Sequence, residues 1–444
     1  MVYLQKSSSE IHNKMFVQRE WISLVLIFVL VVLGNRTSSA AILILAAAFV
    51  SFCILKSDIA NAFYWVLFLV PNIRMFDGIG ISFIVNAIMA LPLVVYAFRA
   101  GIRRVPAIAL LGSICLGTME LFHDAAFNDF THAVTIMGWI LNLLLAMLIT
   151  VDSKIKFSKD DIFSAFSTGI IMSAVMYLLA NNISIMYILE RMNRGLRLAA
   201  YADDPNYYSL YICLAIASIL NVTGKNVYKF CVMFLLVGIG FLTASKMCIM
   251  LMAFEFVLIF LQLFSKRKES RNNKRFIAAM SSGLILGLIV LRDYVQLFLN
   301  NIVRRMGNIN TESFDLDKLT SGRFTILMEY LDILGNDLIC FLFGYGFHYH
   351  LLLDQSSKKG AHNTYMDLIL AWGLLGTIIF VLILFWWSKT FKQSRNIQKV
   401  EFMKKIPMIV LLINFLDLSC LSAGMFPIVI AVVMIQCLPL NQEV

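Results

Sequence analysis

The sequence predicts an all-α polytopic integral membrane protein, and three observations lead to that fold class. Hydrophobic residues occupy 60% of the 444 positions and charged residues only 14%, whereas a soluble domain carries about 45–50% and about 25%. Long apolar stretches recur along the whole chain. They lack the alternation of apolar and polar residues that a membrane barrel requires. A soluble enzyme, a nucleic-acid-binding domain and a disordered chain are therefore excluded.

The apolar stretches predict a helical bundle of about 12–14 transmembrane helices. Lys14 and Arg19 precede the first stretch without a signal-peptide cleavage pattern, so that stretch is predicted to be the first spanning helix. The stretch that ends at Pro71 and the last two in the chain are short, and they are candidates for re-entrant segments. The stretches lie at about 21–34, 40–55, 59–70, 79–98, 105–122, 133–150, 160–180, 206–222, 227–243, 246–264, 276–291, 363–387, 406–421 and 425–439.

The basic residues predict how the chain is oriented. With the N-terminus inside, 24 of the 37 Lys and Arg residues fall on the inner side. Only three outer basic residues, Arg36, Arg74 and Lys246, lie in short loops. Because positive charge in short loops stays cytoplasmic, both termini are expected in the cytoplasm. The other outer basic residues lie in two longer loops, where orientation does not explain them.

This orientation divides the chain into five parts. The two outer loops separate three groups of transmembrane helices, and the larger loop is too long to be a mere connection. The parts are the N-terminal helices 1–180, a smaller basic outer loop 181–205, the central helices 206–291, a large outer loop 292–362 with an amphipathic helix, and the C-terminal helices 363–444.

The amphipathic helix of the large loop is predicted from its apolar spacing. Thr320 and Ser321 can cap it, and Gly335 is expected to stop it. A purely structural interpretation is that the helix lies at the membrane surface and covers the end of the bundle. The same helix places Arg323 at its N-terminal end, near the lipid headgroups. The apolar positions are Phe324, Leu327, Met328, Leu331 and Leu334.

The smaller loop carries Arg191, Arg194 and Arg197 at intervals of three residues. On a helix these side chains would share one face, and a solvated face beside anionic lipid is their bland interpretation. Positive charge on the outer side opposes the usual bias, so a specific anion is inferred as their ligand. Asp204 and Asn206 follow at the start of a helix, where capping is favoured over catalysis.

Histidines gather on the predicted outer side. His362 begins the helix that closes the large loop, and neutral imidazole near pH 7 can accept a proton. His348 and His350 could bind a metal in principle, but no carboxylate or thiolate stands at a suitable spacing, so we expect no metal site. The cytoplasmic side has no phosphate-cradling glycine-rich loop, which argues against an ATP-driven pump.

Several of these motifs together resemble the signature of the O-antigen ligase and O-antigen polymerase superfamily. Those proteins are bacterial membrane glycosyltransferases that use lipid-diphosphate-linked sugars. The resemblance covers residues 190–380, while residues 1–180 are similar only in hydropathy. The motifs are Ser321-Gly322-Arg323, Gly344-Tyr345-Gly346-Phe347, His362-Asn363-Thr364-Tyr365 with Gly373 and Gly376, Asp204-Pro205-Asn206, and Thr243-Ala244-Ser245-Lys246.

The resemblance implies roles for individual residues. Arg323 matches the essential loop arginine of the family, and Arg197 or a neighbour in its cluster is the candidate for the second one. His362 matches the histidine that activates the acceptor hydroxyl. Lys246 stands where the family has arginine, so it keeps the charge but loses the bidentate fork. The residues expected to support the site are Asp204, Asn206, Tyr345, Asn363 and Tyr365.

The chemistry of such a transfer fits these residues. A sugar hydroxyl needs a base, and a leaving lipid diphosphate needs cations, for which arginine forks are suited. The expected partners are a polyprenyl-diphosphate-linked glycan donor, a glycan acceptor, the lipid bilayer and a chain-length regulator, without nucleic acid or cofactor. The expected location is the bacterial cytoplasmic (inner) membrane.

Three functions stay open at this point. Polymerisation of lipid-linked repeat units into O antigen or capsule is favoured, and ligation of the glycan to lipid A-core is the alternative in chemistry. A polysaccharide-lipid flippase or other transporter is the alternative of another class, because Glu255 and Asp417 lie inside apolar stretches. Most candidate groups lie in the outer loops, which favours an enzyme.

Overall fold

The computed structural model describes residues 15–80, 84–100, 107–128, 130, 132–192, 196–202, 204–222, 226–265, 292, 296, 300, 323–352, 362–397, 402–418 and 425–437. Over these residues the chain forms seventeen α-helices and no strand, which confirms the all-α fold class. Thirteen of the fourteen predicted apolar stretches correspond to a helix, and the stretch 276–291 lies outside the described residues.

The helices of the first half are α2 (Phe16–Arg19), α3 (Trp21–Arg36), α4 (Ala40–Lys56), α5 (Ile59–Leu69), α6 (Ile84–Ala100), α7 (Ala107–Phe127), α8 (Ala133–Val151), α9 (Lys159–Ala180) and α10 (Ile185–Arg191). The later helices are α11 (Pro205–Ser218), α12 (Asn226–Leu242), α13 (Lys246–Ser265), α17 (Arg323–Asn336), α18 (Leu338–Phe343), α19 (Thr364–Ser394), α20 (Ile406–Asn414) and α21 (Phe426–Gln436). Short 3₁₀ segments are η1 (Val70–Asn72), η2 (Asp77–Ile79), η4 (Ile219–Asn221), η6 (Gly346–Leu352) and η7 (Phe402–Lys405).

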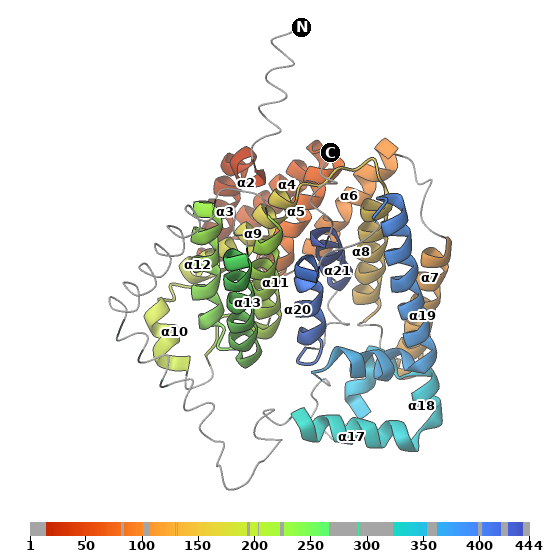
Figure 1. Cartoon of the computed structure of the whole chain (residues 1–444). Helices are drawn as coiled ribbons and strands as arrows, with labels where there is room; N and C mark the ends of the chain where they lie inside the picture. Colours follow the sequence, from red (N-terminus) through yellow and green to blue (C-terminus); the bar gives the residue numbers. More distant parts are fainter. Residues whose placement is uncertain are drawn as a thin grey trace.

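The long helices stand side by side as a bundle, and α2 lies at one end of it (Figure 1). Helices α17 and α18 lie across the opposite end, as expected for the amphipathic part of the large loop. By length and composition, two helices of the described part, α9 and α19, are able to cross a membrane alone. Shorter apolar helices, among them α3, α4 and α12, accompany them.

Helix α19 is broken at Gly373, where the backbone takes φ +63° and ψ −174°. A Cβ atom at this position would lie 2.4 Å from the carbonyl oxygen of Leu342 in α18. Gly344 meets the same break from the other side, because its Cβ would lie 2.4 Å from the carbonyl oxygen of Ala371. The absence of a side chain at both glycines therefore lets the end of α18 pack directly against the break in α19. We call this close backbone contact the interlock, and it fixes the outer helices to the bundle.

We expect Gly373→Ala to lower stability by more than about 1 kcal/mol, because the new Cβ meets both a backbone clash and a left-handed φ. The measurement is the thermal unfolding midpoint of the detergent-purified protein, together with its yield in membranes. Gly238→Ala in α12 is the matched control, since a Cβ there meets nothing within 4 Å. Equal midpoints for the two variants would contradict the interlock.

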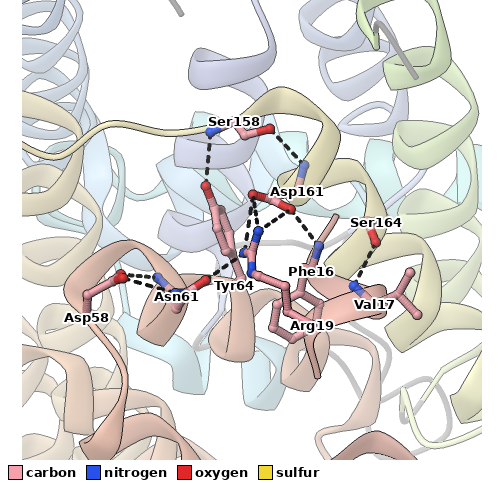
Figure 2. A network of polar contacts seen from close by, with 9 residues as sticks. All are labelled: Phe16, Val17, Arg19, Asp58, Asn61, Tyr64, Ser158, Asp161 and Ser164. Atoms are coloured by element: carbon pink, nitrogen blue, oxygen red, sulfur yellow. Dashed lines mark hydrogen bonds and ion pairs between the residues drawn. The ribbon is translucent and has the colours of Figure 1, made fainter. Parts of the chain in front are cut away.

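The N-terminal helix α2 is anchored by polar contacts at the other end of the bundle (Figure 2). Asp161 of α9 accepts a 2.5 Å hydrogen bond from the Phe16 backbone N–H and forms a 3.2 Å ion pair with Arg19. Arg19 also donates to Asn61 at 2.8 Å. The Phe16 ring is fully buried and packs edge-on against Trp65 at 5.3 Å. Helix α2 is therefore fixed to α9 by polar contacts, and the Phe16 ring adds an apolar contact with α5.

Candidate active site

Arg323 is the first residue of α17, where it is held by the segment that follows α20. Its guanidinium forms an ion pair with the Asp417 carboxylate and donates to the Asp417 backbone carbonyl at 3.0 Å. A guanidinium has five N–H donors, more than these two acceptors use. Burial lowers the pKa of Arg323, and the carboxylate of Asp204 opposes that shift. Arg323 therefore stays a positioned cation that can bind further oxygen ligands.

The same segment after α20 holds the N-terminal end of α19. The Thr364 backbone N–H donates to the Phe415 carbonyl at 2.8 Å, and the Thr364 hydroxyl donates to the Leu418 carbonyl at 2.5 Å. His362 precedes this turn, is partly buried and has a left-handed φ of +49°. One short segment, Phe415–Leu418, thus fixes both the arginine and the helix start that carries the histidine.

Arg197 lies in a polar network at the N-terminal end of α11. Its Nε donates to the Thr243 carbonyl at 2.8 Å, and its Nη2 donates to the Asn206 side-chain oxygen at 2.7 Å. Asp204 accepts the Asn206 backbone N–H at 2.6 Å, so it is the N-cap of α11, as predicted. The carboxylate of Asp204 also acts electrostatically on Arg323 at the start of α17.

Lys246 is the first residue of α13, directly after the turn that accepts the Arg197 hydrogen bond. The turn includes Ala244 at φ +50°, and the Ser245 side chain accepts the Cys248 backbone N–H at 3.4 Å. Arg197 therefore joins the motif Asp204–Asn206 to the motif Thr243–Lys246. Lys246 is the last residue of the second motif.

The shared arginine face predicted for the smaller loop does not form. Helix α10 ends at Arg191, and residues 196–199 have no helical structure, so Arg191 and Arg197 do not belong to one helix. Arg191 is exposed and lies over the Tyr187 ring at 4.5 Å. The three-residue spacing does not produce a shared helix face, because the tertiary contacts of Arg197 with Thr243 and Asn206 outweigh helix propensity here. Arg194 lies outside the described residues.

Two of the expected supporting residues, Asn363 and Tyr365, hold the backbone at the start of α19. Asn363 caps α19 by accepting the Tyr365 and Met366 backbone N–H groups at 3.0 and 3.2 Å. The Tyr365 hydroxyl donates to the Leu412 carbonyl of α20 at 3.1 Å. Their contacts fix the start of α19 against its neighbour.

Tyr345 connects the outer helices to the break in α19. Its backbone N–H donates to the Leu370 carbonyl at 2.7 Å, and its hydroxyl donates to the Asp337 carboxylate. That hydrogen bond raises the pKa of Tyr345 to about 12 and lowers the pKa of Asp337. Tyr345 therefore acts as a neutral donor that joins α18 to α19.

The site as a whole combines cations with one base candidate. Arg197, Lys246 and Arg323 supply positive charge, and Asp204 and Asp417 position it. Within the described part of the chain, no group of three or more His, Cys, Asp or Glu residues could hold a metal ion. The arrangement can bind an anionic group and, at His362, accept a proton.

Sequence reasoning missed the role of Asp417. Its place in an apolar stretch suggested a transporter, but the structure pairs it with Arg323. A carboxylate in an apolar environment is costly unless a cation pairs with it. The position of Asp417 in an apolar stretch therefore indicates a basic partner, and the loop arginines are candidates for it. Glu255 is fully buried, and its carboxylate oxygens have no hydrogen-bond partner among the described residues. The transporter hypothesis thus keeps only one of its two carboxylates.

Comparison with known proteins gives one family match. Residues 231–381 match the family model described as O-Antigen ligase. The matched range includes Lys246, Arg323 and His362, while Arg197, Asp204, Asn206 and Asp417 lie outside it. Neither the curated proteins nor the solved structures compared with the chain gave a match.

Proposed function

We propose that this chain, whose residues 231–381 match the O-Antigen ligase family model, polymerises lipid-linked oligosaccharide repeat units. The match supports a role in surface polysaccharide synthesis at a membrane. The proposal adds that it is a glycosyltransferase acting on polyprenyl-diphosphate donors at the outer face of the bacterial cytoplasmic membrane. Its termini lie in the cytoplasm, and a chain-length regulator is a further partner.

One observation carries the proposed glycosyl transfer: the segment Phe415–Leu418 contacts both Arg323 and the start of α19. Asp417 binds the guanidinium, and the Phe415 and Leu418 carbonyls bind Thr364, two residues after His362. A cation for phosphate and a base for a hydroxyl are therefore held by one structural element. Glycosyl transfer from a diphosphate needs that combination.

In the proposed reaction, His362 accepts the proton of the acceptor sugar hydroxyl as its oxygen attacks the anomeric carbon of the donor. The bond between that carbon and the diphosphate oxygen breaks, and the lipid diphosphate leaves with the electron pair. Arg323, Arg197 and Lys246 stabilise the negative charge that grows on the leaving group. The diphosphate bond supplies the driving force, so the reaction needs no nucleotide outside the cell.

Ligation to lipid A-core is the second candidate, because the matched family model is described as O-Antigen ligase. Polymerase and ligase would share the donor, the cations and the base, and would differ in the acceptor. The contacts around Arg323 and His362 serve either acceptor equally well.

The test uses the purified full-length protein in proteoliposomes that contain a polyprenyl-diphosphate-linked repeat unit. A polymerase is expected to produce a ladder of longer lipid-linked glycans without any other acceptor. Lipid A-core is added in a second arm, and glycans are separated by gel electrophoresis. Product that forms only in the second arm identifies a ligase.

The transporter alternative has its own outcome in this system. Passage of a labelled lipid-linked glycan across the bilayer without a new glycosidic bond would overturn the enzyme proposal. The Glu255→Gln variant is the matched control, because a carboxylate-dependent transporter would lose this passage, whereas the proposed enzyme does not use Glu255.

A further inference from the structure

Two buried carboxylates lie on α7, outside the site described above. Glu120 and Asp124 each have an exposed fraction of 0%. Glu120 Oε1 accepts the backbone N–H of Phe347 at 2.7 Å. Asp124 Oδ1 lies 2.9 Å from Nε2 of His348, which is also buried. Burying carboxylates is costly, so their position against one short segment of the outer loop calls for a function.

The contact between α7 and that segment is as close as a backbone allows. Gly346 has φ +65°, and a Cβ there would lie 2.6 Å from His123 Cβ and 2.9 Å from Glu120 Oε1. Only glycine fits both this φ and this approach without strain. The His348 ring also stacks on Phe127 at a centroid distance of 5.0 Å. The segment Gly346–Tyr349, called here the clamp segment, is thus held to α7 by polar and apolar contacts.

The clamp segment in turn contacts both helices of the candidate site. The Tyr349 hydroxyl donates to the Asp367 carboxylate at 2.5 Å. Asp367 lies in the first turn of α19, a helix that begins two residues after His362. The Tyr349 ring packs edge-on against Tyr330 of α17 at 5.5 Å. A path of direct contacts therefore runs from Glu120 and Asp124 to the helix of Arg323 and to the helix of His362.

We propose that Glu120 and Asp124 are positioning residues that set the separation of Arg323 and His362 through the clamp segment. This inference rests on the proposed function, in which the donor diphosphate binds Arg323 and the acceptor hydroxyl contacts His362. A displacement of roughly 1 Å between the two partners of such a transfer lowers its rate by about 10²-fold. The two carboxylates touch neither partner and act only through the backbone that they hold.

The kinetic test compares removal of each carboxylate with its amide replacement. Glu120→Ala removes the acceptor of the Phe347 N–H, whereas Glu120→Gln keeps an oxygen there; Asp124→Ala and Asp124→Asn make the same comparison. In the proteoliposome assay, the alanine variants are expected to lower kcat at least ~10-fold, with KM for the donor changed far less. The amide variants should recover most of the turnover. Ser113→Ala, at a fully buried polar position on the same helix, is the matched control.

A second measurement does not depend on catalysis. Spin labels at Met328→Cys in α17 and Leu375→Cys in α19, both partly exposed, report the distance between these helices in an otherwise Cys-free chain. Glu120→Ala is expected to broaden the distance distribution, and Glu120→Gln and Ser113→Ala to leave it unchanged. An unchanged distribution in Glu120→Ala, or equal kcat for the alanine and amide variants, would overturn the inference. If the unaltered protein forms no glycan product, the proposed function fails, while the label distances still decide whether the clamp exists.

Discussion

Replacing His362 with alanine is expected to abolish polymer formation while the protein remains inserted in the membrane at its normal level. The reason is that His362 lies before the first turn of α19, where Asn363 and Thr364 make the capping and anchoring contacts. Loss of a general base lowers a rate by about 10²–10⁴-fold. Cells should therefore accumulate single repeat units on the lipid carrier, as measured by length analysis of the surface polysaccharide.

The control for this variant is Leu375→Ala on the same helix, a partly exposed side chain that should leave polymer length unchanged. Both variants need matched membrane levels, measured by immunoblot. Polymer of normal length and amount from His362→Ala would refute its role as the base, and the family match would then support the fold without this mechanism.

Arg323→Lys is expected to lose most activity, although it keeps the positive charge. A lysine ammonium cannot bind the Asp417 carboxylate and a diphosphate with the fork geometry of a guanidinium. Loss of a hydrogen-bond donor that stabilises the negative charge of the transition state lowers kcat by about 10²-fold or more. Arg323→Ala should therefore be only slightly worse than Arg323→Lys. Initial rates in proteoliposomes at saturating donor measure the difference.

Arg74→Lys is the matched control for the arginine variants, because Arg74 is exposed and its ion pair with Asp77 is long, at 3.8 Å. It should retain the rate of the unaltered protein. An Arg323→Lys rate close to that value would mean that charge alone matters at this position, and the bidentate argument would be wrong.

The helices were predictable because hydropathy is a local property. Thirteen of the predicted apolar stretches correspond to helices with similar bounds. The spacing of apolar residues from Phe324 to Leu334 predicted α17. The N-cap role of Asp204 also followed from adjacent residues. Such predictions succeed where the deciding contacts lie within one turn of the chain.

The assembly of the site was not predictable in the same way. Arg323 meets a carboxylate 94 residues later, and His348 meets one 224 residues earlier. The neighbours of His348 in the sequence suggest no role for it. In the structure its side chain is buried and contacts the Asp124 carboxylate. Periodicity carries no information about such pairs, and only the resemblance pointed to Arg323 and His362 together.

The anchor of α2 has a consequence for how the protein is made. Arg19 and its partner Asp161 are separated by 142 residues. At a synthesis rate of about 5–20 residues per second, α9 emerges from the ribosome roughly 7 to 28 seconds after α2. With the N-terminus in the cytoplasm, as proposed, the positive charges that precede α3 would have to keep the orientation of that helix during this interval. The contacts of Arg19 with Asp161 in Figure 2 can form only after α9 has been synthesised, so they would stabilise an orientation already set by those charges.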